Sequence, residues 1–191
     1  MSQPETQLKK AVVHIHIGDY YASREPEIIH TLLGSCVAVC LIDPVQQIGG
    51  MNHILLPGKP DLRLFDDSAR YGINAMELLI NKILNLGGKR RLLIAKAFGG
   101  GHIMPAISKE NGVGKRNAKF VIDFLHNERI RIVNQDLGGQ ESRKIYFHTD
   151  TGEVFVKRIH HACWQKIARE EKKQSFRIQS KLKKSGDVIL F

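Results

Sequence analysis

The sequence predicts a single α/β domain built around a mixed sheet. Its 191 residues suffice for one sizeable core, and 42% of them are hydrophobic, as in ordinary globular domains. Residues 91–139 read as strand, helix and strand, which favours a crossover between parallel strands. Residues 33–57 and 143–159 read as hairpins, which add antiparallel strands to the sheet.

Composition and charge limit the classes of function. No apolar run reaches the roughly 18 residues of a membrane-spanning helix. The opening MSQPETQLKK lacks the apolar segment of a signal peptide, so we expect a cytoplasmic protein. The net charge of +10, much of it after Lys157, indicates an acidic partner: nucleic acid, a membrane surface or an acidic protein. Such a basic run is also typical of a solvated helix or tail.

The first predicted strand covers residues 11–17 (AVVHIHI), whose apolar residues alternate onto one face. His14 and His16 share the opposite face. An HxH pair can bind a metal, but no third ligand is close in the sequence, so we favour a solvated strand face. Two apolar strands follow, 33–43 and 48–57, and an Asp-Pro turn joins them.

The most regular helix is predicted over residues 66–88, where apolar residues recur at helical spacing. Asp66, Asp67 or Ser68 can cap its start, and Gly87-Gly88 can end it. The remaining elements are a strand, a helix, a strand, a hairpin with a TDTG turn and a terminal helix, over residues 91–102, 115–128, 129–139, 143–159 and 163–173.

Three glycine-rich segments raise the question of a nucleotide site: Gly49-Gly50, Ala97–Gly101 and Leu137–Gly139. The second follows a strand, as phosphate-binding loops do. None contains GxGxxG or GxxxxGK[ST], and the helix after Gly101 begins many residues later. We interpret them as tight turns where two backbones approach closely.

The cysteine count predicts free thiols. Cys36, Cys40 and Cys163 are odd in number and form no CxxC pair, so neither a zinc site nor a disulfide is indicated. If Asp43–Gln46 is the turn of the hairpin, Cys36 faces His53 directly across it. Directly opposed residues share a face, with Cβ atoms roughly 4.5–5.5 Å apart. The sequence permits this pairing without forcing it, because turns of type I or II splay hairpin strands.

A thiol beside an imidazole has a chemical use. The imidazole stabilises the thiolate, the thiolate attacks an acyl carbon, and the imidazolium protonates the leaving group. The Gly-Ser-Cys turn can also offer backbone N–H groups, including that of Cys36, to a developing oxyanion. The alternative is plain packing, with Cys36 and Cys40 buried in a core and His53 hydrogen-bonded beside them.

The stretch LLGSCVAVCLIDPVQQIGGMNHILLP resembles the CheD family, the chemoreceptor glutamine deamidases of bacterial chemotaxis. The resemblance continues through YGINAMELLINKILNLGG, LLIAKAFGGGHI, GVGKRNAKFVIDFL and DLGGQESRKIYFHTDTGEV, and covers roughly residues 10–160. It implies a mixed-sheet α/β sandwich like that of the cytotoxic necrotizing factor deamidases. The implied CheD-like domain is 1–164, and a basic C-terminal extension, 165–191, follows it.

The resemblance also implies an activity. Family members hydrolyse the side-chain amides of chosen receptor glutamines to glutamate and release ammonia, without a cofactor or a metal. The family nucleophile falls on Cys36 and the base on His53, and Thr31 is the candidate third member, which would orient the imidazole. Cys40 is expected to be packing. The implied partners are the cytoplasmic domains of methyl-accepting chemoreceptors, helical bundles rich in Glu and Gln that would attract a basic enzyme.

Two other functions stay open at this point. Some family members bind the chemotaxis phosphatase CheC, so an adaptor for receptors or for a CheC-type phosphatase is an alternative. Nucleic-acid binding is disfavoured, because neither an RNP-type stacking motif nor a helix-turn-helix is evident; Trp164 and the His160-His161 pair read as a packed helix start. His102 stands where the family has a small residue. Neither His102 nor the basic extension has an assigned role.

Overall fold

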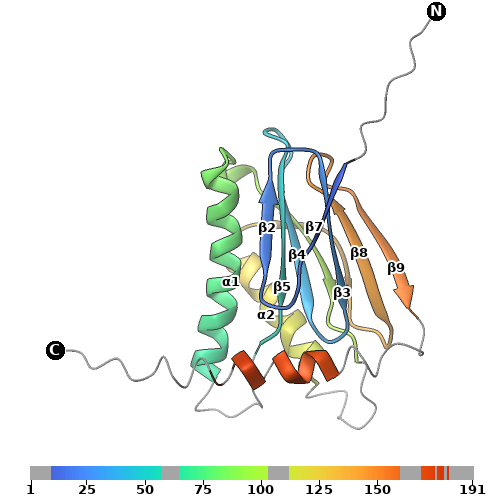
Figure 1. Cartoon of the computed structure of the whole chain (residues 1–191). Helices are drawn as coiled ribbons and strands as arrows, with labels where there is room; N and C mark the ends of the chain where they lie inside the picture. Colours follow the sequence, from blue (N-terminus) through green and yellow to red (C-terminus); the bar gives the residue numbers. More distant parts are fainter. Residues whose placement is uncertain are drawn as a thin grey trace, which may run out of the picture.

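The computed structural model describes residues 10–56, 65–102, 112–159, 169–174, 176–178 and 180. Within these residues, nine strands form two sheets, and two long helices cover the outer face of the larger one (Figure 1). The layers are therefore helices, a five-stranded sheet and a four-stranded sheet. Both sheets contain parallel and antiparallel pairs, which confirms the predicted mixed-sheet α/β sandwich in a single domain.

The five-stranded sheet has the order β2 (Tyr20–Ser23), β5 (Ile48–Ile54), β4 (Val37–Asp43), β6 (Ile94–Gly99) and β7 (Arg131–Leu137). The four-stranded sheet has the order β1 (Ala11–His14), β3 (Glu27–Leu33), β8 (Ser142–His148) and β9 (Val154–Ile159). The helices are α1 (Phe65–Asn85), α2 (Val113–Asn127) and a short 3₁₀ turn, Arg90–Leu92. None of them, among the described residues, is long and apolar enough to cross a membrane.

Strand β4 lies at the centre of the molecule, and all seven of its residues are buried. Its side chains alternate between two apolar clusters. Val37, Val39 and Leu41 pack under the helices, whereas Ala38, Cys40 and Ile42 pack between the two sheets. Burial on both faces explains why this segment is almost continuously apolar.

The helices predicted over residues 66–88 and 115–128 and the parallel crossover are confirmed. Gly87 and Gly88 end α1 as predicted, because Gly88 N donates to Ile83 O and Gly87 has a φ of +105°. Strands β6 and β7, which precede and follow α2 in the sequence, pair in parallel. Strands β8 and β9 form the predicted hairpin. The proposed caps of α1 at residues 66–68 fall on side chains outside the described set.

The N-terminal third of the chain differs from the prediction. Strands β2 and β3 were not predicted, and the first strand ends at His14 rather than at residue 17. The predicted strand 33–43 is interrupted at Gly34-Ser35-Cys36. There the chain leaves β3 in one sheet and enters β4 in the other. The turn that carries the thiol is thus a crossing between sheets.

The predicted register of the β4–β5 hairpin is wrong by two residues. Asp43 pairs with Ile48, so the loop contains four residues, and His53 lies opposite Ala38 instead of Cys36. The cause is the side chain of Asp43, whose Oδ1 accepts hydrogen bonds from the N–H groups of Val45 and Gln46. A shift of two residues keeps every side chain on its predicted face.

The glycine segments serve close packing, as interpreted from the sequence. A Cβ on Gly49 would lie 2.4 Å from Thr149 O, and one on Gly99 would lie 2.2 Å from Cys36 O. The terminal helix predicted over 163–173 is helical from 169 to 174. Its start, with Cys163, Trp164 and the His160-His161 pair, lies outside the described residues. The division of the chain after residue 164 stays a prediction.

Candidate active site

Backbone hydrogen bonds from one loop, distant in sequence, hold the Gly34-Ser35-Cys36 turn in place. Gly100 N donates to Cys36 O at 2.7 Å, and Gly101 N donates to Gly34 O at 2.8 Å. The glycine loop after β6 is therefore the support of the turn that carries the thiol. Because Gly99 has a φ of +112° and abuts Cys36 O, a side chain cannot enter at this position without displacing that turn.

A buried asparagine fixes the same turn from the helix layer. Asn117 on α2 has no exposed surface; its Nδ2 donates to Ser35 O at 2.8 Å and its Oδ1 accepts from Leu56 N at 3.0 Å. It thus joins the turn to the residues that follow β5. Asn117 was not predicted as a site residue, although a polar residue on the apolar stripe of a helix was a usable signal.

His53 is positioned by its backbone and by one side chain. Its N–H donates to Asp19 O and its carbonyl accepts from Gly18 N, so the loop before β2 continues the sheet beside it. The Nδ1 atom lies 2.8 Å from the hydroxyl of Thr31 on β3, across the interface between the two sheets. The structure therefore brings together His53 and Thr31, two of the three residues predicted for the site.

The second hydrogen bond of Thr31 determines the tautomer of His53. The Thr31 hydroxyl donates its single proton to Ile15 O at 2.7 Å, and a carbonyl can only accept. His53 Nδ1 must then be the donor to Thr31, which leaves the lone pair on Nε2. In the described part of the chain Nε2 is buried and has no hydrogen-bond partner. It is thus a base that is free to take a proton.

Cys36 lies on the same side of the five-stranded sheet as His53. Cys36 packs in the apolar cluster between the sheets with Ala38, and Ala38 is directly opposite His53. Cys36 is two positions along from Ala38, so thiol and imidazole are diagonal neighbours and not an opposed pair. Cys40 is 1% exposed in the same cluster, where it packs.

A carboxylate from the C-terminal segment closes this site. Oε1 of Glu171 accepts the N–H of Ser35 at 2.9 Å and that of Cys36 at 3.3 Å, and the Ser35 hydroxyl donates to Oε2 at 2.5 Å. The two N–H groups converge on one oxygen, which is the arrangement that stabilises an oxyanion.

The electrostatics keep the Cys36 thiol and the His53 imidazole neutral in this conformation. Burial raises the pKa of the Cys36 thiol well above its ordinary value, and the charge of Glu171 raises it further. Burial lowers the pKa of His53 to about 3, and the nearby His16 and His14 add to this effect. The site therefore holds a thiol and a neutral imidazole, so the expectation of a thiolate stabilised by the imidazole does not describe this state.

Other candidates from the sequence lie outside this centre. The rings of His14 and His16 contact each other 4.3 Å apart, and His14 stacks on His30 at 4.5 Å. Among the described residues no group of three or more His, Cys, Asp or Glu side chains is arranged to hold a metal ion. His102 joins the glycine loops through its backbone N–H, which donates to Gly139 O.

Comparison with known proteins gives the family. Residues 55–158 match the family model described as CheD chemotactic sensory transduction. A protein of Shewanella oneidensis, named probable chemoreceptor glutamine deamidase CheD 1, is 45% identical over 98% of this chain and 91% of its own. This chain belongs to the CheD family.

Two further CheD proteins are similar to this chain over most of its length. The one from Thiobacillus denitrificans is 45% identical over 91% of this chain and 86% of its own, and one from Vibrio cholerae is 40% identical over 94% and 78%. Each is named a probable chemoreceptor glutamine deamidase. The 98% overlap with the Shewanella CheD protein takes in most of the extension 165–191, so the likeness continues into the segment that bears Glu171.

Proposed function

We propose that this chain deamidates glutamine side chains of methyl-accepting chemoreceptors, with Cys36 as nucleophile, His53 as general base and acid, and Thr31 as the residue that orients His53. The observation that carries the proposal is the convergence of the Ser35 and Cys36 N–H groups on one side-chain oxygen beside a thiol. The names of the CheD relatives support the choice of substrate. No cofactor or metal takes part.

The reaction begins with the transfer of the thiol proton of Cys36 to Nε2 of His53. Because the imidazole is neutral and its Nε2 has no hydrogen-bond partner among the described residues, it can accept this proton as a general base, so the resting enzyme need not hold a thiolate. The sulfur attacks the side-chain carbon of the receptor glutamine. The oxygen of the tetrahedral intermediate is stabilised by the N–H groups of Ser35 and Cys36.

The second half of the reaction restores the enzyme. The imidazolium of His53 gives its proton to the departing nitrogen, the C–N bond breaks, and ammonia leaves a thioester on Cys36. His53 then takes a proton from water, the hydroxide adds to the thioester, and the C–S bond breaks as the imidazolium returns the proton to the sulfur. The products are a receptor glutamate and the free thiol. Through both steps Thr31 keeps the Nδ1 proton in place and so keeps Nε2 as the reactive nitrogen.

The net charge of +10 suits a partner whose helices are rich in glutamate, in the cytoplasm. Raising the salt concentration is expected to weaken receptor binding, and an affinity that stays the same from low to high salt would exclude this charge match.

The alternative of an adaptor that binds receptors or a CheC-type phosphatase is favoured by one observation, the closed site with its protonated thiol.

Ammonia release from purified receptor distinguishes the two functions. Wild type is expected to release ammonia, Cys36→Ala none, and Cys40→Ala close to the wild-type amount, since Cys40 only packs. Full release by Cys36→Ala would exclude Cys36 as the nucleophile. No release by wild type together with tight receptor binding would establish the adaptor.

A further inference from the structure

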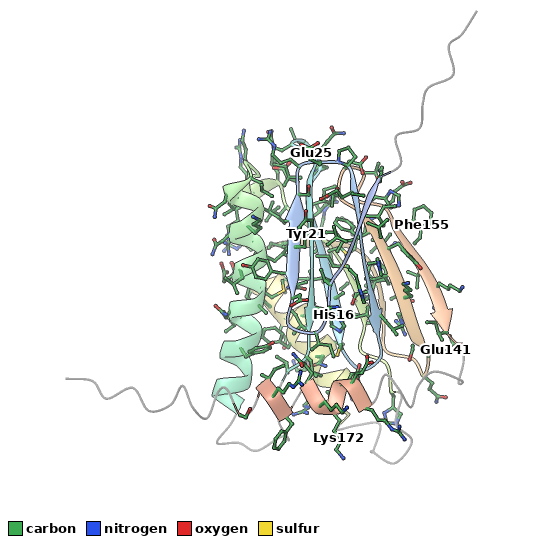
Figure 2. The ribbon with its side chains drawn as sticks, in the orientation of Figure 1. His16, Tyr21, Glu25, Glu141, Phe155 and Lys172 are labelled. Carbon is green, nitrogen blue, oxygen red and sulfur yellow. The ribbon has the colours of Figure 1, made fainter. Side chains whose placement is uncertain are left out.

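The C-terminal helical segment, residues 169–174 and 176–178, docks one face on the proposed active site. It runs beneath one end of the sheets in Figure 1, and Lys172 points away from the body in Figure 2. Glu171 and Ile178 face inward and are only 5% and 6% exposed, and Gln174 between them donates to Ile17 O. The neighbours of Glu171 on either side, Glu170 and Lys172, are exposed.

The group that this helix delivers has the chemistry of the reaction product. A deamidated glutamine is a glutamate, and Glu171 presents that same carboxylate to the Ser35–Cys36 turn. One of its oxygens accepts both backbone N–H groups, and the other accepts the Ser35 hydroxyl. Both N–H groups that the proposed reaction would turn towards the substrate carbonyl oxygen are therefore occupied by this one side chain.

We propose that the C-terminal helix is an internal ligand of the active site, in which Glu171 stands in the place of the product glutamate. This inference rests on the proposed deamidase function and adds a regulation to it. The described conformation is the closed one, and a receptor must displace the helix to reach Cys36. Tethered groups meet their site at an effective concentration of roughly millimolar, so the helix competes strongly with a receptor at micromolar concentration.

The mode of docking also indicates how a substrate is presented. Glu171 reaches the turn from a helix whose positions 171, 174 and 178 face the enzyme, with the side chain at 171 inserted. The same surface then accepts a receptor helix that carries a glutamine at the inserted position, a hydrogen-bond donor three residues further on and an apolar side chain seven residues further on.

Replacing Glu171 by its amide turns the internal ligand into an internal substrate. In Glu171→Gln the Cys36 sulfur would attack the new side-chain carbon, ammonia would leave with a proton from His53, and water would hydrolyse the thioester. One amide and one water give one carboxylate and one ammonia, so the chain restores Glu171 by itself. The readout is a gain of roughly 1 Da on the peptide that contains position 171.

The test uses variants of the full-length chain and includes two matched controls. Glu171→Gln is expected to gain the mass with Cys36 intact and to keep the amide when combined with Cys36→Ala. Glu170→Gln places an amide on the exposed neighbouring position and is expected to keep it. Conversion at 171 that also occurs without Cys36 would overturn the inference, because it would not be enzymatic.

The outcomes separate this inference from the proposed function. If Glu171→Gln keeps its amide while wild type deamidates receptor glutamines, the internal ligand is refuted and the deamidase stands. If neither the amide at position 171 nor any receptor glutamine is converted, the deamidase function is refuted and the inference with it. A second readout is kcat/KM on receptor, expected to rise about tenfold in Glu171→Ala and to stay unchanged in Glu170→Ala. An unchanged or lower value in Glu171→Ala would show that Glu171 only supports the turn and would overturn the inference.

Discussion

Thr31 on β3 and His53 on β5 are hydrogen-bonded at 2.8 Å across the interface between the two sheets, and the proton in that bond belongs to His53. The bond therefore does two things at once. It joins the sheets through a polar contact inside an otherwise apolar layer, and it holds the imidazole in the tautomer whose Nε2 is free.

Thr31→Val is expected to lower kcat about ten- to a hundredfold. The substitution keeps the shape but removes both the acceptor for His53 Nδ1 and the donor to Ile15 O, a loss of roughly 1–3 kcal/mol for each buried group left unsatisfied. Thr31→Ser retains the hydroxyl and is expected to retain most of the activity. Receptor deamidation rates of the two variants check this. Equal rates for Thr31→Val and wild type would show that the contact does not orient the base.

The buried imidazole of His53 is expected to make stability depend on pH. The pKa of His53 is about 3 in the folded chain and 6.5 in the unfolded chain, so between these values only the unfolded chain binds the proton. Its contribution to stability is complete above pH 6.5 and is lost as the pH falls towards 3, by about 1.4 kcal/mol per pH unit.

Urea unfolding of wild type and His53→Asn at pH 7 and pH 5 measures this contribution. The asparagine amide can still donate to Thr31 but does not titrate. Wild type is expected to lose about 2 kcal/mol more than the variant between the two pH values, because other titrating groups cancel in the difference. Parallel losses in the two proteins would mean that His53 is not held neutral.

Gly99, which abuts the Gly34-Ser35-Cys36 turn, is expected to tolerate no side chain. Gly99→Ala would bring a Cβ to 2.2 Å from Cys36 O and is expected to cost about 3 kcal/mol or more of unfolding free energy, together with activity. Gly138 also has a positive φ but has nothing within 4 Å of the added atom, so Gly138→Ala is expected to cost only about 1–2 kcal/mol. Denaturant unfolding compares them, and equal costs would refute the close approach.

The parts of the fold that could be predicted from sequence are those decided by local pattern. The apolar periodicity of α1 and its two closing glycines are visible in the sequence, and so is the βαβ order of β6, α2 and β7. Strand β3 was missed because Thr31 breaks its apolar face, and that break is the polar contact to His53. The residue that interrupts the apolar pattern is therefore one that the candidate site uses.

The sequence was sufficient to predict that Cys36 and His53 lie on the same face of the sheet, but not which residues pair across the hairpin. A two-residue turn was assumed, whereas the Asp43 carboxylate accepts from its own loop and from Lys89 N, which stabilises a loop of four residues. The contact of Glu171 with Ser35 joins residues 136 positions apart. An acidic residue in a basic tail carries no local sign of such a contact, because only the tertiary fold brings its partner near.

Mass spectrometry of a chemoreceptor co-expressed with this chain tests the central claim most directly. Wild type is expected to add roughly 1 Da at particular receptor glutamines, and Cys40→Ala is expected to do the same. Cys36→Ala is expected to leave those glutamines unchanged. A receptor that gains the same mass with Cys36→Ala as with wild type would contradict the account.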